Sequence, residues 1–292
     1  QKQIGELLRR ERIYKEQIRT LTAAVSALSS SPAPREQLDL ALSQLEHGNI
    51  ATAKIIFKEV LERGAEDAHA AAGHLGAITF FTEPEEAIKA YKLATSLDPR
   101  NLYSWNQLGH LLKRVGRLDE ALKAYSKLIA FGHGHPKNVA TAVGNIGDIY
   151  RMKGDHAAAI SKYNESLEMS ELIKDDEGKA IQRCNLGNMY REIGDVDRSE
   201  NESLQSLAMA ERNGQKEVMA ATLGNLGLAC FLKERFREAG EYYRRSLRID
   251  ENIGNKLGIA RQYGNLGLLY VREGDHIKAE DSYKRSLEIA EK

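Results

Sequence analysis

The chain has 292 residues, and its 42 Lys and Arg side chains balance its 42 Asp and Glu side chains. A protein that wraps nucleic acid needs a strongly basic surface, so the zero net charge argues against that class of partner. Two cysteines are too few for a disulfide framework or a metal knuckle, and no apolar run approaches the ~18 residues of a membrane span.

The chain begins with Gln rather than Met and shows no signal peptide. We therefore expect a piece of a longer polypeptide, with any anchor or targeting signal upstream of residue 1. The scarcity of cysteine suits a reducing compartment, so the expected location is the cytoplasm. No membrane span is expected within this segment.

Residues 1–30 carry a seven-residue hydrophobic period that predicts one amphipathic helix. The first heptad positions hold Ile4, Glu11, Ile18 and Val25. The fourth heptad positions hold Leu7, Tyr14, Leu21 and Leu28. β-Branched residues at first positions and Leu at fourth positions favour a parallel two-stranded coiled coil, which would make the protein a homodimer.

Three roles are compatible with this heptad helix. It could dimerise, dock onto the segment that follows, or form the end of a longer helix upstream. A short amphipathic seam binds any complementary apolar surface, so the sequence favours dimerisation but leaves all three roles open. Residues 31–34, Ser-Pro-Ala-Pro, break the helix and predict a short linker.

An internal repeat of 40 residues runs through the second half of the chain. Its most regular feature is an Asn-x-Gly triplet, whose glycine recurs at Gly147, Gly187, Gly227 and Gly267. The same pattern continues upstream with a shorter period, around Trp105, Leu75 and Phe57. The sequence therefore predicts seven units, near residues 34–67, 68–100, 102–137, 140–178, 180–218, 220–258 and 260–292.

Each unit is predicted to be a pair of antiparallel helices. In the fourth unit the first helix should stop at Gly154, and Asp155 can then cap the second helix. The second helix carries a small residue, Ala159, and four positions later Tyr163, which would fill the gap between neighbouring units. Ser203 replaces this aromatic residue in the fifth unit. One pair cannot bury its apolar face alone, so the pairs must stack.

The spacing Trp-x-x-Leu-Gly-x-x-Tyr, followed by Ala, Tyr or Phe, Ala and Pro, resembles the tetratricopeptide repeat. The best matches are Trp105–Pro136 and Ala72–Pro99, while the 40-residue units resemble the longer repeats of kinesin light chain and Pins/LGN-type adaptors. The resemblance covers about nine-tenths of the chain. It implies an all-α fold, a right-handed α-solenoid of about seven helix pairs, preceded by the heptad helix. Cys230 and the pair Glu234 and Arg235 depart from the pattern in the sixth unit.

The resemblance also implies that the first helix of each unit lines a concave groove. The residue two before each repeat glycine would then face this groove, and it is Gln107, Asn145, Asn185, Asn225 or Asn265. A carboxamide both donates and accepts hydrogen bonds, so a ladder of amides can bind the backbone of an extended peptide. The preceding residues are small and would let a ligand main chain approach, at Gly144, Cys184, Gly224 and Gly264. The alternative is that each amide only packs against the neighbouring unit.

Side chains one helical turn beyond the amides would set specificity. Basic residues are expected along the middle units, at Lys113, Arg114, Arg151 and Arg191. Apolar residues are expected toward the C-terminal end, at Leu228, Phe231 and Leu268. A protein or peptide partner with an acidic stretch followed by bulky apolar residues would suit this gradient.

No catalytic or cofactor-binding spacing is present, because the chain has neither HExxH nor GxxxxGK[ST] nor a Gly-rich loop after a strand. His133 and His135 lie in a Gly-rich loop without a third ligand, which favours a plain turn over a metal site. Cys184 is expected to face the groove and Cys230 the core, both in structural roles. We expect no cofactor, no metal and no enzymatic activity.

The sequence therefore predicts a protein-interaction scaffold that binds a peptide segment of a partner in its concave groove. A first alternative is a self-assembling scaffold whose groove takes the N-terminal helix of another copy. A second alternative is the regulatory arm of a larger enzyme or signalling receptor, with a catalytic domain outside this segment.

Overall fold

The computed structural model describes residues 36–62 and 68–290 of the chain. The predicted heptad helix over residues 1–30, its oligomerisation residues and the linker over residues 31–34 all lie outside the described residues. Within the two described ranges every regular element is an α-helix and no strand occurs. No helix in these ranges is long and apolar enough to cross a membrane.

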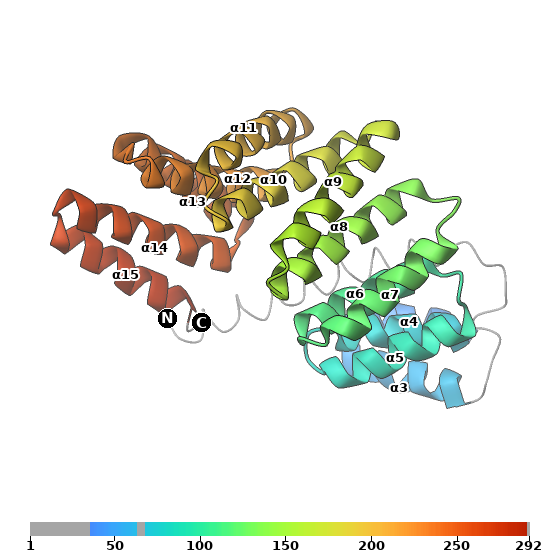
Figure 1. The fold of residues 1–292 in the computed structure, drawn as a ribbon. Coiled ribbons are helices and arrows are strands. Elements are labelled where there is room, and N and C mark those ends of the chain that lie inside the picture. Colours follow the sequence, from blue (N-terminus) through green and yellow to red (C-terminus); the bar gives the residue numbers. More distant parts are fainter. Residues whose placement is uncertain (1–35, 63–67, 291–292) are drawn as a thin grey trace. The chain divides into compact units, whose positions relative to one another are not determined.

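The described helices form seven consecutive helix pairs (Figure 1). The first helices of the pairs are α2 (Glu36–Glu46), α4 (Ala68–Thr79), α6 (Leu102–Arg114), α8 (Pro136–Met152), α10 (Asp176–Glu192), α12 (Lys216–Leu232) and α14 (Lys256–Glu273). The second helices are α3 (Ile50–Glu62), α5 (Pro84–Leu97), α7 (Leu118–Phe131), α9 (His156–Leu172), α11 (Val196–Asn213), α13 (Phe236–Ile253) and α15 (His276–Ala290). This arrangement confirms the predicted all-α solenoid of helix pairs.

The helices group into two compact units, with the boundary between Gly134 and His135. The described part of the first unit holds α2–α7, and that of the second holds the longer helices α8–α15. The boundary therefore falls where the 40-residue period begins, whereas the sequence predicts one continuous array. The first helices of the long repeats also begin four residues before their expected starts near 140, 180, 220 and 260. Each of these helices begins with proline or a charged residue, so the apolar period of the sequence does not mark the first residue of the helix.

The predicted turn between paired helices is present in the fourth repeat. Gly154 has a φ of +78°, which favours glycine, and the Asp155 Oδ1 accepts a hydrogen bond from the Ala158 N–H at 3.0 Å. The sixth repeat departs from this pattern, as its sequence indicates. Glu234 takes the left-handed position with a φ of +59°, and the Arg235 Nη2 donates to the Cys230 Sγ at 3.1 Å.

The aromatic residue of the second helix packs against the repeat glycine of its own pair. A Cβ built on Gly147 would lie 2.7 Å from the Tyr163 ring, so the ring occupies the space that a side chain would need. Tyr163 also belongs to a buried cluster with Leu186 and Met189 of the following pair. The tyrosine therefore fills the gap between neighbouring pairs as predicted, and the glycine makes room for it.

A serine that is buried in three repeats and half-buried in the last also recurs at 40-residue intervals. Its hydroxyl donates to a backbone carbonyl on the first helix of the same pair, 26 residues earlier, over 2.6–2.8 Å, at Ser166, Ser206, Ser246 and Ser286. This bond ties the two helices of a pair together. The repeated Ser-Leu doublet in the sequence is the signal that could have revealed it.

Replacing Ser206 by Ala should lower the free energy of unfolding of the second unit by about 1 kcal/mol, because a buried hydrogen bond to the Ala180 carbonyl is lost. Ser203 provides a matched control on the same helix. Its hydroxyl is buried without a hydrogen-bond partner among the described residues, so Ser203→Ala should cause no loss. Urea denaturation of both variants measures the difference, and equal losses would contradict the assignment.

Candidate functional site

In the second unit the first helices of the pairs form an inner row. Helix α10 lies against both α8 and α12, and α12 also lies against α14. Consecutive second helices make no comparable contact with each other. The first helices are therefore closer together than the second helices, as expected for the concave side of a solenoid, and this row is the candidate site.

The four predicted amides all lie on this row, but they differ in their surroundings. Asn145 on α8 is 9% exposed, whereas Asn185, Asn225 and Asn265 are half-buried. The Asn225 Nδ2 donates to the Cys184 carbonyl oxygen of the preceding repeat at 3.3 Å. The Asn265 Nδ2 donates to the Gln262 Oε1 on its own helix at 3.1 Å. Packing between repeats thus already uses one hydrogen-bond donor of the Asn225 amide, in line with the packing alternative.

Two of the small residues before the amides, Gly144 and Gly224, face a side chain of the following repeat and leave no open space for a ligand. A Cβ built on Gly144 would lie 2.6 Å from the Gln182 Nε2, and one on Gly224 would lie 3.1 Å from the Gln262 Nε2. Both glutamines are buried. The interpretation of Gly144 and Gly224 as places where a ligand main chain approaches is therefore wrong.

Cys184 stands in the same position in the fifth repeat and is also buried between repeats, so the expectation that it faces the groove is wrong. The opposing residue there is Thr222, which is fully buried and lies close to the thiol. At each of these three contacts a small residue faces a larger residue of the next repeat. The larger residue comes 38 positions later in the sequence. The predicted site residues do not include this position, although the sequence signals it through the recurrence of Gln182 at Gln262, 80 residues on.

The predicted basic residues make internal contacts. The Arg114 guanidinium lies 4.5 Å from the centre of the Phe80 ring and donates to the Phe80 carbonyl oxygen within the first unit. In the second unit, the Arg151 Nη1 pairs with the Glu192 Oε1 at 3.3 Å, and the Arg191 Nη2 donates to the Asn188 Oδ1 at 2.8 Å. The positive charge expected along the middle repeats is therefore partly compensated.

The remaining predicted residues of the first unit, Gln107 and the half-buried Lys113, lie on α6. They belong to a different compact unit from the four asparagines. The structure therefore groups Asn145, Asn185, Asn225 and Asn265 on one row, and places the predicted residues of α6 in a separate body.

The C-terminal end of the inner row exposes apolar side chains. Leu232 on α12 is 54% exposed, and on α14 Leu268 is 40% and Val271 is 43% exposed. Leu228 is half-buried, and the Phe231 ring packs edge-on against Phe236 with 5.5 Å between the ring centres. The predicted apolar end is thus present, with Leu232, Leu268 and Val271 as its most accessible members.

The sequence pattern of the tetratricopeptide repeat family matches residues 101–172, 138–212, 179–252 and 218–292, which together span 101–292. The chain belongs to the tetratricopeptide repeat family. No curated protein matches the sequence closely enough to count as a relative.

Solved structures of several other proteins share this fold. BtubC (BKLC) from P. vanneervenii is 19% identical, with a TM-score of 0.58 over 71% of this chain and 88% of its own. A STAND signal transduction ATPase with a tetratricopeptide repeat sensor, from Pyrococcus horikoshii, is 17% identical, with a TM-score of 0.65 over 87% and 41% of the two chains. A kinesin light chain-like protein from Podospora anserina with nearly identical TPR-like repeats is 16% identical to this chain, with a TM-score of 0.50 over 66% and 96% of the two chains. The predicted likeness to kinesin light chain is thereby confirmed at the level of the fold.

The tetratricopeptide repeats make this chain a protein-interaction scaffold.

Within the described residues, no three His, Cys, Asp or Glu side chains come together in a way that could hold a metal ion. Burial raises the pKa of the Cys184 thiol, and it raises the pKa of the Cys230 thiol to about 11. Both thiols therefore stay protonated at neutral pH, which suits the structural roles that the sequence analysis gave them.

Proposed function

We propose that the second unit binds a peptide segment of a partner protein along the inner row α8, α10, α12 and α14. The observation that carries this proposal is the group of exposed apolar side chains on neighbouring helices, Leu232, Leu268 and Val271. Exposed apolar groups that lie together on a folded protein mark interaction sites. Asn265 lies one helical turn before Leu268, and Asn225 lies two turns before Leu232. Both amides can hydrogen-bond a peptide backbone with the capacity that packing leaves free.

The same row favours a partner with bulky apolar anchors at one end and carboxylates at the other. Apolar anchors would cover the exposed side chains on α12 and α14 and remove them from water. Carboxylates would approach Arg151 and Arg191, which lie on α8 and α10. Because Glu192 competes for Arg151, we assign most of the affinity to the apolar end.

Replacing Leu268 and Val271 by Asp should abolish capture of the partner, because two charges would have to be buried at the apolar contact. A pull-down with the full chain, read by mass spectrometry, measures the loss. The matched control is Ile277→Asp with Leu287→Asp on α15, where the side chains are 84% and 62% exposed but lie outside the inner row. If both double variants lose the same partners, or neither does, the inner row is not the site.

The amides are tested by replacing Asn185 and Asn225 with Ala. Alanine is the better helix former, so the melting temperature should change little despite the lost bond from Asn225 to the Cys184 carbonyl. Partner binding should weaken by about 1–3 kcal/mol if two peptide hydrogen bonds disappear. A large fall in the melting temperature with intact binding would instead assign the amides to packing alone.

The heptad pattern of residues 1–30 favours a second candidate function, in which the inner row takes this segment from another copy of the chain. Light scattering of the chain with and without residues 1–33 separates the two functions. A complex that falls apart on truncation, and that Leu268→Asp with Val271→Asp also disrupts, would support self-assembly. A complex that survives on the Asp variant would place dimerisation in the heptad helix alone.

A further inference from the structure

A pocket of about 350 Å³ lies in the first unit, between the second helices α5 and α7 and over α6. Its size is at the lower end of ligand-binding pockets and suits one or two side chains of a peptide. On α6 the pocket is lined by Trp105, Leu108 and Leu112. At 100° per residue these three positions share one face of α6, opposite to Gln107 and Arg114. The pocket is therefore distinct from the inner face predicted for this helix.

The floor of the pocket is apolar and rigid. Leu108, Leu112 and Ala124 are almost fully buried within the fold and contribute its base. Trp105 is half-buried, and its indole Nε1 donates to the Pro99 carbonyl oxygen at 2.9 Å. That bond holds the ring in place, so the pocket offers a fixed aromatic surface to an apolar group.

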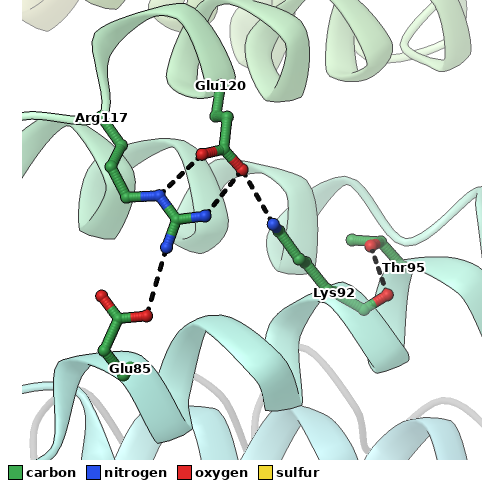
Figure 2. Close-up of polar contacts among 5 residues, drawn as sticks. All are labelled: Glu85, Lys92, Thr95, Arg117 and Glu120. Carbon is green, nitrogen blue, oxygen red and sulfur yellow. Dashed lines mark hydrogen bonds and ion pairs between the residues drawn. The ribbon is translucent and has the colours of Figure 1, made fainter.

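The single carboxylate in the lining is already neutralised (Figure 2). The Glu120 side chain accepts hydrogen bonds from the Arg117 Nε at 2.7 Å and from the Lys92 Nζ at 2.8 Å. Arg117 also pairs with Glu85 on α5 at 3.2 Å. This network bridges α5 and α7 beside the pocket, and it leaves Glu120 little capacity to repel an incoming carboxylate.

The hydroxyl groups of the lining are also satisfied, because the Thr95 and Ser96 side chains donate to carbonyl oxygens of their own helix. Lys123 and Lys127 are different. They lie one turn apart on α7, are exposed, and form no ion pair or hydrogen bond within the described part of the chain. Two unpaired ammonium groups thus stand at the rim of an apolar pocket.

We propose that this pocket binds an acidic peptide segment of a partner protein, with an apolar side chain inserted over Trp105 and flanking carboxylates on Lys123 and Lys127. Apolar burial supplies the anchor, and the lysines select negative over positive flanks. This site does not depend on the inner row of the second unit, so the two proposals stand or fall separately.

Trp105 is the only tryptophan of the chain and reports on this pocket alone. The test is a fluorescence titration of the full chain with the capped peptides EEFEE, EELEE, EESEE and KKFKK. EEFEE and EELEE should change the Trp105 emission until binding saturates. EESEE and KKFKK should bind at least about tenfold more weakly. Raising the salt concentration should weaken EEFEE binding, because the lysine contacts are exposed and screened.

The variant Lys123→Gln with Lys127→Gln should weaken EEFEE binding by about tenfold, since both carboxylate contacts are lost. The matched control is Lys216→Gln with Arg248→Gln, two exposed cations of the second unit, which should leave the titration unchanged. Circular dichroism checks that both variants remain helical. The proposal is overturned if none of the peptides changes the Trp105 emission, if EEFEE and KKFKK bind equally, or if the Lys123 and Lys127 variant retains full affinity.

Discussion

Replacing Gly227 by Ala should destabilise the second unit by about 1–3 kcal/mol, even though alanine is the better helix former. A Cβ at this position would lie 2.4 Å from the Tyr243 ring, and Tyr243 is completely buried. The ring belongs to a cluster with Leu266 and Leu269 of the following pair, so it cannot move without disturbing two repeats. Overpacking should therefore outweigh the gain in helix propensity.

Gly264 provides the matched control for this prediction. It also lies inside a first helix, but a Cβ there would meet only the Ser286 Oγ, at 3.7 Å. Gly264→Ala should therefore stabilise the protein by about 0.5–1 kcal/mol through helix propensity. Thermal melting followed by circular dichroism compares the two variants. If Gly227→Ala is as stable as Gly264→Ala, the tyrosine does not require the glycine.

The sequence predicts the helix pairs well because their signals are local. Gly154 and Asp155 show where one helix ends and the next begins, and the structure confirms both roles. The recurrence of Tyr163 after the small residue Ala159 likewise shows which face is buried. Each of these signals depends only on residues that lie a few helical turns apart in the sequence.

The candidate site is predicted less well because its partners are distant in sequence. Gly144 looks like an opening for a ligand until Gln182 is seen against it. Arg114 looks like a groove cation, but it stacks on Phe80, which lies in the preceding repeat. A repeat pattern gives the face on which a residue lies, whereas the side chain that it meets depends on the variable positions of the next repeat.

The first unit should lose stability in mild acid because of one buried histidine. His74 is 1% exposed and stacks on Phe57, with 5.2 Å between the ring centres. Burial lowers its pKa to about 4 from the usual 6.5. As the pH falls below 6.5, the unfolded chain binds a proton that the folded chain rejects, so stability falls until the pH reaches about 4. A shift of this size corresponds to roughly 3 kcal/mol.

His74→Phe should remove this acid-dependent loss of stability and preserve the ring stacking on Phe57. The variant should therefore become more stable than the parent chain as the pH falls from 7 toward 4. Trp105 fluorescence during urea unfolding measures the first unit selectively, because that unit holds the only tryptophan. The exposed His133→Gln is the control and should keep the acid sensitivity of the parent chain. Parallel pH profiles for His74→Phe and the parent chain would show that another group causes the acid loss. If burial of a neutral imidazole causes the acid loss, the unfolding free energies of the two chains should converge above pH 7. Below pH 7 the difference between them should widen.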